Sequence, residues 1–350
     1  MTDPLPPETR AFHRDCLVLD LHIDTLLWMR LLRYDIGTRH RNRIPGAPFC
    51  WHLDLPRAAD GGLDASVFGL VINPTVPRRE LMLPLRLLAR AERGSGFAQT
   101  LDALELLRQA EQSYPDRLAF ARSGSEIRRA VADGRFAALP CLEGSHGIGG
   151  EIDNARKAHA RGLRMLGLVH FQATEVGYPM TVDAFEGRGL TPFGFELLAE
   201  LERLGIVVDL AHLNARGVDD ALSVLKRPFV VSHTACRALH DRTRNLTDDQ
   251  IRRVADRGGV VGIAVGRDFL GRRGVDGYLD HVEHAMRVGG EDAVAIGSDY
   301  DGAIVPAVGM GDVRSYPLVT HGLLARGHAH DAVRKLLGEN ALRVITDVCG

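Results

Sequence analysis

Short runs of apolar residues recur along the chain and alternate with longer amphipathic stretches. Eight of these runs are nearly continuous in Val, Ile, Leu and Ala, which is typical of strands buried on both faces of a parallel sheet. The predicted strands cover residues 16–22, 65–72, 136–144, 163–170, 206–212, 229–234, 259–265 and 293–299. The stretches between them repeat apolar residues at helical spacing, which predicts helices at 97–112, 194–205, 247–258 and 276–290. Thr247 stands where it can cap the third of these helices.

Strands that alternate with helices predict an α/β fold, in which helices cover a parallel sheet. Eight such units within about 300 residues fit a (β/α)8 TIM barrel better than an open doubly wound sheet. No GxGxxG motif follows the first predicted strand, which weakens the alternative of a dinucleotide-binding fold. We therefore expect a single barrel domain over residues 1–350. Residues 31–62 and 172–190 show no clear pattern, and we expect long loops there that face the active site.

The overall composition is that of an ordinary globular protein. The chain is 45% hydrophobic and 25% charged, and its formal net charge of −2 argues against nucleic acid or an anionic membrane as partner. Five dispersed cysteines without a CxxC pair favour reduced thiols and a cytoplasmic location. We see no signal peptide at the start and no apolar stretch of the ~20 residues that a membrane span requires.

Ionisable side chains stand at the ends of six of the predicted strands. They are His22 and Asp24, Glu143, His170, His212, His233 and Asp299. Taken singly, each has a structural explanation: a lone histidine is usually hydrogen-bonded, and Asp24 could cap the following helix. In a parallel barrel, however, all of these ends face one rim. Independent caps and turns have no reason to gather there, so the set indicates a metal site.

The chemistry of these side chains suits two divalent ions. His22 and Asp24 are two residues apart on an extended chain, so both project from the same side and can reach one Zn²⁺. His212 and His233 offer two nitrogen ligands for a second ion. Histidine and carboxylate ligands without cysteine also allow Mn or Co.

Two neighbouring cations need a bridging anion. In some barrel hydrolases a carboxylated lysine supplies it, but none of the three lysines of this sequence lies at a strand end. Glu143 is therefore the natural bridge. A hydroxide shared by the two metals can attack a carbonyl at neutral pH. Asp299 is the best candidate to hold the water and carry its proton to a leaving amine.

These residues belong to an ordered series of motifs that resembles the membrane dipeptidase (renal dipeptidase) family of zinc peptidases. The motifs are 20-DLHIDTL-26, 142-LEGSHGI-148, 166-LGLVHFQ-172, 209-DLAHLN-214, 232-SHTACRA-238, 243-TRNLTDDQI-251, 259-GVVGI-263, 280-DHVEHAMRVGGEDAVAIGSDYDG-302 and 337-LGENALRVI-345. The similarity runs from about residue 14 to residue 346 and covers nearly the whole chain. The chain looks like the soluble bacterial members of that family.

The resemblance implies a (β/α)8 barrel with two Zn²⁺ per chain. By motif match, one zinc would be held by His22, Asp24 and Glu143. The other would be held by Glu143, His212 and His233. A homodimer is the family expectation.

The resemblance also implies roles around the metals. His170 matches the histidine that contacts the substrate near the scissile carbonyl, and Asp299 matches the catalytic aspartate. Arg244 matches the arginine that receives the substrate's C-terminal carboxylate, a task that suits a guanidinium fork. Arg244 could also be a plain surface arginine. Phe269 stands where some relatives have a tyrosine hydroxyl for that carboxylate, so the chain departs from the family pattern there.

We therefore predict a zinc-dependent dipeptidase that hydrolyses L-Xaa-L-Xaa dipeptides through a metal-bridging hydroxide. The family often accepts a D-residue at the C-terminal position, which extends the expectation to L-Xaa-D-Xaa. One alternative is a hydrolase of N-acyl amino acids or lactones, because the metal chemistry does not specify the leaving group. Another is a non-catalytic ligand-binding barrel, although a binding protein would have little use for Asp299.

Overall fold

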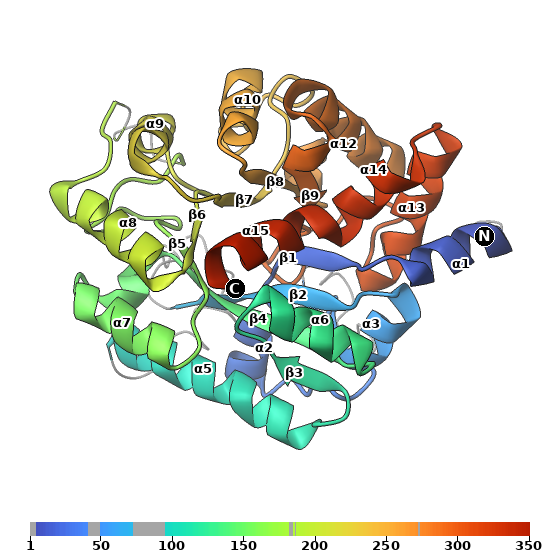
Figure 1. Ribbon diagram of the computed structural model, residues 1–350, viewed down its shortest axis with the longest axis horizontal. Coiled ribbons are helices and arrows are strands. Elements are labelled where there is room, and N and C mark those ends of the chain that lie inside the picture. Colours follow the sequence, from blue (N-terminus) through green and yellow to red (C-terminus); the bar gives the residue numbers. More distant parts are fainter. Residues whose placement is uncertain (1–4, 41–49, 73–94, 182–184, 186, 272–273) are drawn as a thin grey trace.

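A closed barrel of parallel strands forms the centre of the molecule (Figure 1). The computed structural model describes residues 5–40, 50–72, 95–181, 185, 187–271 and 274–350. The strands pair in the order β2-β1-β9-β8-β7-β6-β5-β4, and the pairing of β2 with β4 closes the ring. The predicted TIM barrel is confirmed.

Each of the eight predicted strands overlaps an observed one. The strands are β1 (Leu19–Ile23), β2 (Ala65–Val71), β3 (Leu118–Phe120), β4 (Phe136–Glu143), β5 (Met165–Gly167), β6 (Val207–Asp209), β7 (Val230–Thr234), β8 (Val260–Ile263) and β9 (Val294–Ile296). The short strand β3 was not predicted, and among the described residues it pairs with the start of β4. A run of three residues is too short to show a period.

Helices surround the barrel. They are α1 (Pro7–Asp15), α2 (Thr25–Leu32), α3 (Leu55–Gly61), α5 (Gly96–Ser113), α6 (Gly124–Ala132), α7 (Ile152–Ala160), α8 (Pro192–Leu204), α9 (Ala215–Val224), α10 (Asp248–Asp256), α11 (Arg267–Leu270), α12 (Val275–Gly289), α13 (Tyr316–Ala325), α14 (His330–Arg334) and α15 (Asn340–Cys349). Across the described ranges, no helix combines the length and the apolar character needed to cross a bilayer.

The four predicted helices correspond to α5, α8, α10 and α12. Thr247 caps α10 as predicted, because its hydroxyl accepts from the Gln250 N–H while the Gln250 side chain accepts from the Thr247 N–H. The expected loop 31–62 is partly wrong, since α3 forms within it. The Asp54 carboxylate caps that helix by accepting from the Arg57 N–H.

The last helix closes one end of the barrel. Apolar residues that fill the ring, such as Val207, Val230 and Val260, belong to one buried cluster with Leu342 and Ile345 of α15. In Figure 1, α15 (red) crosses in front of the strands. Its side chains meet the turns that lead into the strands, which places α15 at their amino-terminal ends. The polar side chains therefore lie at the opposite, carboxyl-terminal rim, which α15 does not cover.

Candidate metal centre

The polar residues singled out in the sequence leave the strands at the same rim. His22 and His233 lie within β1 and β7, and Glu143 ends β4. Asp24 directly precedes α2, and its side chain makes no cap hydrogen bond. The structural alternative, in which Asp24 only caps that helix, is therefore wrong.

Three of the candidate residues lie past the ends of the observed strands. His170, His212 and Asp299 follow β5, β6 and β9 in the chain and lie outside them. His212 (φ 67°) and Asp299 (φ 64°) have left-handed backbones, which no strand residue adopts. This conformation is costly for a residue with a side chain, and such strain is concentrated at functional sites. Each of these residues lies three positions past the end of its strand.

The structure gathers the candidate ligands into three overlapping groups. In each group, the ligand atoms lie within 4.8 Å of one another. The groups are His22 with Asp24 and Glu143, Glu143 with His212 and His233, and His22 with His233 and Asp299. The first two groups have the same membership as the two ligand sets that the family resemblance implied.

Glu143 occupies the middle of the cluster. Its Oε1 atom lies 3.1 Å from Nε2 of His212, 3.5 Å from Nε2 of His22, and 3.6 Å from Nε2 of both His170 and His233. All five side chains are buried. One carboxylate oxygen thus faces four imidazole nitrogens, which is the arrangement expected of an anion that bridges two ion sites.

Many polar atoms of the cluster lack a hydrogen-bond partner among the described residues. They are both ring nitrogens of His22, Oδ1 of Asp24, Oε2 of Glu143, and Nδ1 of both His170 and His212. A buried polar atom left unpaired costs about 1–3 kcal/mol. Imidazole nitrogens and carboxylate oxygens are the usual ligands of zinc, so a divalent cation fits this donor set.

Burial sets the protonation of the histidines. Burial and the nearby guanidinium of Arg244 hold the pKa of His212 well below its usual range, and burial does the same for His233. Burial alone would also lower the pKa of His22, but the carboxylates of Asp24 and Glu143 outweigh it and raise that pKa. Neutral imidazoles are the form that binds metals.

Burial also favours the protonated form of the carboxyls. Burial, reinforced by Asp24, holds the pKa of Glu143 well above its usual range. It raises the pKa of Asp299 to about 8, although His22 opposes the shift. Several carboxylates packed together without a cation repel one another, and a divalent ion would relieve this.

Arg244 lies at the edge of the cluster, after β7. Its Nη2 atom is 3.2 Å from Nε2 of His212, and Nη1 is 3.7 Å from the sulfur of Met180. The guanidinium stacks over the ring of Phe269, with 5.4 Å between its central carbon and the ring centroid. Arg244 is thus partly buried beside the candidate ligands, and its guanidinium contacts His212.

Asp301 holds the segment around His52 against the same rim. Its carboxylate accepts from the Thr25 hydroxyl at 2.5 Å and from the His52 N–H at 2.7 Å. The His52 ring returns the bond by accepting from the Asp301 N–H. Nothing local in the sequence reveals this partner, because Asp301 and His52 are 249 positions apart.

Two further aspartates escaped the sequence analysis. Asp20 and Asp209 are buried in β1 and β6, and each carboxylate accepts from a serine, Ser298 and Ser232 respectively. Each serine directly precedes a residue of the cluster. The only sequence signal was a carboxylate inside an otherwise apolar strand, as in 18-VLDLH-22.

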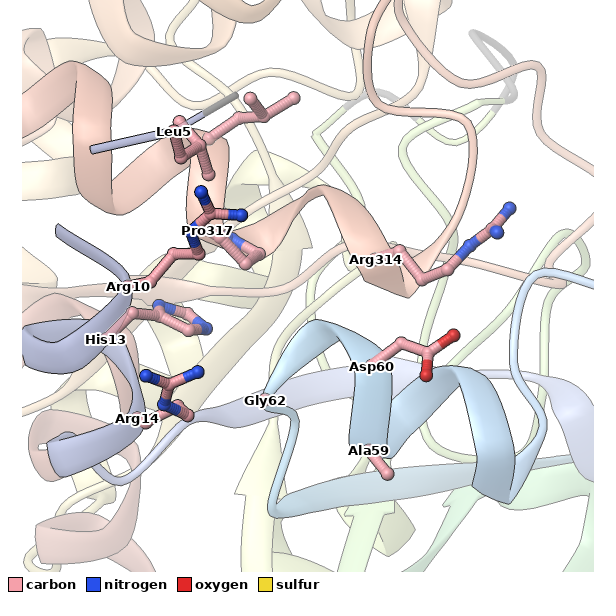
Figure 2. A pocket seen from close by; sticks show the side chains of 10 residues that line it. Leu5, Arg10, His13, Arg14, Ala59, Asp60, Gly62, Arg314 and Pro317 are labelled. Atoms are coloured by element: carbon pink, nitrogen blue, oxygen red, sulfur yellow. The ribbon is translucent and has the colours of Figure 1, made fainter. Parts of the chain in front are cut away.

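A separate pocket of about 430 Å³ lies between α1, α3 and the start of α13 (Figure 2). Arg10, His13 and Arg14 line one side of it, and Asp60 lies on the other. Both ring nitrogens of His13 are engaged, with Thr320 and with the carbonyl of Gly61. None of the predicted site residues lines this pocket, so it is distinct from the candidate metal centre.

Comparisons with known proteins agree with this geometry. The sequence model of the membrane dipeptidase family, peptidase family M19, matches residues 7–349. Dipeptidase tcpJ of Claviceps purpurea (strain 20.1) is 29% identical over 327 residues, which cover 92% of this chain and 75% of that protein.

Two solved structures of similar proteins cover almost the whole barrel. A metallopeptidase from Rhodobacter sphaeroides, solved with a phosphinate mimic of the dipeptide L-Ala-D-Ala, is 30% identical with a TM-score of 0.81. The match covers 95% of this chain and 99% of that one. Dipeptidase AC, a metallopeptidase of family M19, is 29% identical with a TM-score of 0.80, over 96% and 99% of the two chains. The chain therefore belongs to the membrane dipeptidase family and is a metal-dependent peptide hydrolase.

Proposed function

We propose that this enzyme is a zinc-dependent dipeptidase that holds two Zn²⁺ at the carboxyl-terminal rim of the barrel. His22, Asp24 and Glu143 would bind one ion, and Glu143, His212 and His233 the other. The observation that carries the proposal is the position of Glu143, whose Oε1 faces ligand atoms of both groups. Two bound zinc ions would lower the pKa of a shared water and polarise the peptide carbonyl.

Asp299 is suited to move the proton of the reaction. Burial raises its pKa to about 8, so near neutral pH the carboxyl can both take up and release a proton. It belongs to the same ligand-atom group as His22 and His233, within reach of whatever the cluster binds. We assign it the transfer of a proton from the attacking water to the leaving amine.

His170 is suited to contact the substrate. Burial keeps its pKa well below the usual range, so it is a neutral imidazole, and its Nδ1 has no partner among the described residues. A neutral ring can donate one hydrogen bond without adding a positive charge beside the metals. We assign it a contact with the scissile carbonyl, which would stabilise the oxyanion that develops there.

Arg244 would limit the substrate to short peptides. Its guanidinium lies 3.2 Å from Nε2 of His212, next to the candidate ligands. A guanidinium can bind a carboxylate through two parallel hydrogen bonds. The Rhodobacter metallopeptidase is solved with a mimic of L-Ala-D-Ala. We therefore propose that L-Xaa-D-Xaa dipeptides are substrates beside L-Xaa-L-Xaa. Phe269, which carries no hydroxyl, would leave the carboxylate to Arg244.

Metal analysis followed by a substrate screen tests this function. The purified protein is expected to contain two zinc ions per chain and to cleave members of a library of L-Xaa-L-Xaa and L-Xaa-D-Xaa dipeptides. Two metals without any dipeptide cleavage would favour N-acyl amino acids or lactones as substrates. A protein that binds no divalent ion would overturn the proposed mechanism.

We also propose a cytoplasmic location. The support is that all five cysteines are free thiols in the structure, as expected in a reducing compartment. Fractionation of the cells that produce the protein would test it, and recovery outside the cytoplasm would contradict it.

A further inference from the structure

A buried chain of hydrogen bonds leads from Asp209 through Ser232 to His233. The Oδ2 atom of Asp209 is 2.5 Å from the Ser232 hydroxyl, which is 2.9 Å from Nδ1 of His233. The other oxygen, Oδ1, accepts from the backbone N–H groups of Ser232 (2.9 Å) and Ala211 (3.0 Å). All three side chains are almost completely buried, so no solvent competes for these bonds.

The direction of each bond follows from the groups themselves. Two backbone N–H groups donate to Oδ1 of Asp209 and the Ser232 hydroxyl donates to Oδ2, because a carboxylate can only accept. The Ser232 hydroxyl therefore donates its proton to Asp209. Its oxygen then has only lone pairs to offer to His233, so Nδ1 of that ring carries the proton.

The other nitrogen of His233 faces the metal cluster. Its Nε2 lies 2.9 Å from Nε2 of His212 and 3.6 Å from Oε1 of Glu143. With the proton held on Nδ1, the lone pair of Nε2 points at the position where an ion would sit. A ring protonated on Nε2 would present a hydrogen there and could not coordinate.

We propose that Asp209 and Ser232 are positioning residues that lock His233 in the Nδ1–H tautomer and thereby keep Nε2 ready for a metal ion. The proposal rests on the proposed metal site. Asp209 also joins the end of β6 to β7, so the same carboxylate ties the strand ends that carry His212 and His233.

A second aspartate and serine provide a matched control. Asp20 accepts the N–H groups of His22 (3.1 Å) and Ser298 (2.9 Å) on Oδ1, and the Ser298 hydroxyl (2.5 Å) on Oδ2. The arrangement resembles that of Asp209 with two differences: the Tyr316 hydroxyl also donates to Oδ2 of Asp20, and among the described residues no imidazole nitrogen hydrogen-bonds to Ser298. Removing this hydroxyl disturbs a similar carboxylate without touching the tautomer of His233.

The Asp209→Asn variant should reverse the chain of bonds. The two backbone N–H groups need an acceptor, so the amide oxygen stays toward them and the NH₂ group faces Ser232. That NH₂ donates to the Ser232 oxygen, whose proton then turns to Nδ1 of His233. The ring is driven to the Nε2–H tautomer, which opposes the metal.

Three variants separate this effect from a general loss of structure. Ser232→Ala removes the acceptor from Nδ1 without imposing the wrong tautomer, so Zn²⁺ affinity should fall roughly 10-fold. Asp209→Asn should weaken it roughly 100-fold or more. The double variant Asp209→Asn/Ser232→Ala has no hydroxyl to donate to His233, so its affinity should recover toward that of Ser232→Ala. Ser298→Ala should leave the His233 tautomer unchanged.

The readouts are Zn²⁺ affinity, by competition with a chelator, and nitrogen-15 shifts of the histidine rings in the metal-free protein. Thermal unfolding checks that each variant folds. If the parent binds no metal, the proposed function fails before this inference is reached. If the parent binds metal but Asp209→Asn binds it as well as Ser232→Ala does, or the double variant is no better than Asp209→Asn, the tautomer lock is wrong.

Discussion

The Oε1 atom of Glu143 lies 3.1 Å from the Nε2 atom of His212, although the two residues are 69 positions apart. The same oxygen lies 3.5 Å from Nε2 of His22 on the other side of the cluster. Both candidate ion sites therefore depend on one carboxylate. Removing its charge should affect both ions at once, whereas loss of a terminal ligand should affect one.

Glu143→Gln should reduce the metal content from two ions per chain to one or fewer. A neutral amide offers one acceptor oxygen and no charge to offset two cations. Hydrolysis should fall at least about 100-fold, since the attacking water would lose one of its two activating ions. Elemental analysis and dipeptide turnover measure the two effects. Glu151→Gln, on an exposed glutamate, is the control, and full metal occupancy in Glu143→Gln would contradict the bridging role.

Asp299→Asn should lower kcat by about 10²–10⁴ while both ions remain bound, because an amide cannot carry the proton. The ligands in the two proposed ion sets are untouched, so metal content should equal that of the parent. Steady-state kinetics beside metal analysis distinguish loss of proton transfer from loss of metal. A variant that matches the parent on every dipeptide would show that Asp299 has no such role.

Arg244→Lys should raise KM for dipeptides by about 10–100-fold with a smaller effect on kcat, since lysine cannot form the two parallel bonds of a guanidinium. The matching test uses a dipeptide amide, which lacks the carboxylate. Parent and variant should cleave the amide with similar kcat/KM. Arg242→Lys, on the exposed neighbour, should leave both substrates unaffected. Equal losses on the acid and the amide would assign Arg244 to the metal centre instead.

Asp64 should make the fold less stable as pH rises from about 4 to about 6. Burial raises its pKa to about 6, although the Val18 N–H donates to it. The unfolded carboxyl has the ordinary pKa of about 4, so in this window the folded chain binds the extra proton. Its contribution is fully present below pH 4 and is lost as pH rises through 6, by about 3 kcal/mol.

Denaturant unfolding of the parent and Asp64→Asn across this window measures the effect. The difference in unfolding free energy should shift in favour of the variant as pH rises, because the amide does not titrate. Asp116→Asn, on an exposed aspartate, should show no such slope. A constant difference between parent and Asp64→Asn would contradict the raised pKa.

Much of the barrel could be predicted from periodicity. Strands such as β4 are buried along their whole length, and parallel pairing on both sides gives them the continuous apolar composition that marks them in the sequence. Strand ends were less predictable. Leu210 and Ala211 continue the apolar run of β6, but the observed strand ends at Asp209 and the backbone of His212 is left-handed, and no residue type in this run predicts either feature.

The sequence by itself determined which chemical groups stand at the carboxyl ends of the strands. Side-chain identity and the position of each apolar run along the chain can both be read from a short segment. Only the tertiary structure decided how far apart those groups lie, that Glu143 is central, and which atoms lack partners. It also disclosed Asp209 behind His233, since the bond from Ser232 to Asp209, 23 positions away, depends on the register of β6 against β7. Distances between strand ends are set by the closing of the barrel, and no single segment carries that information.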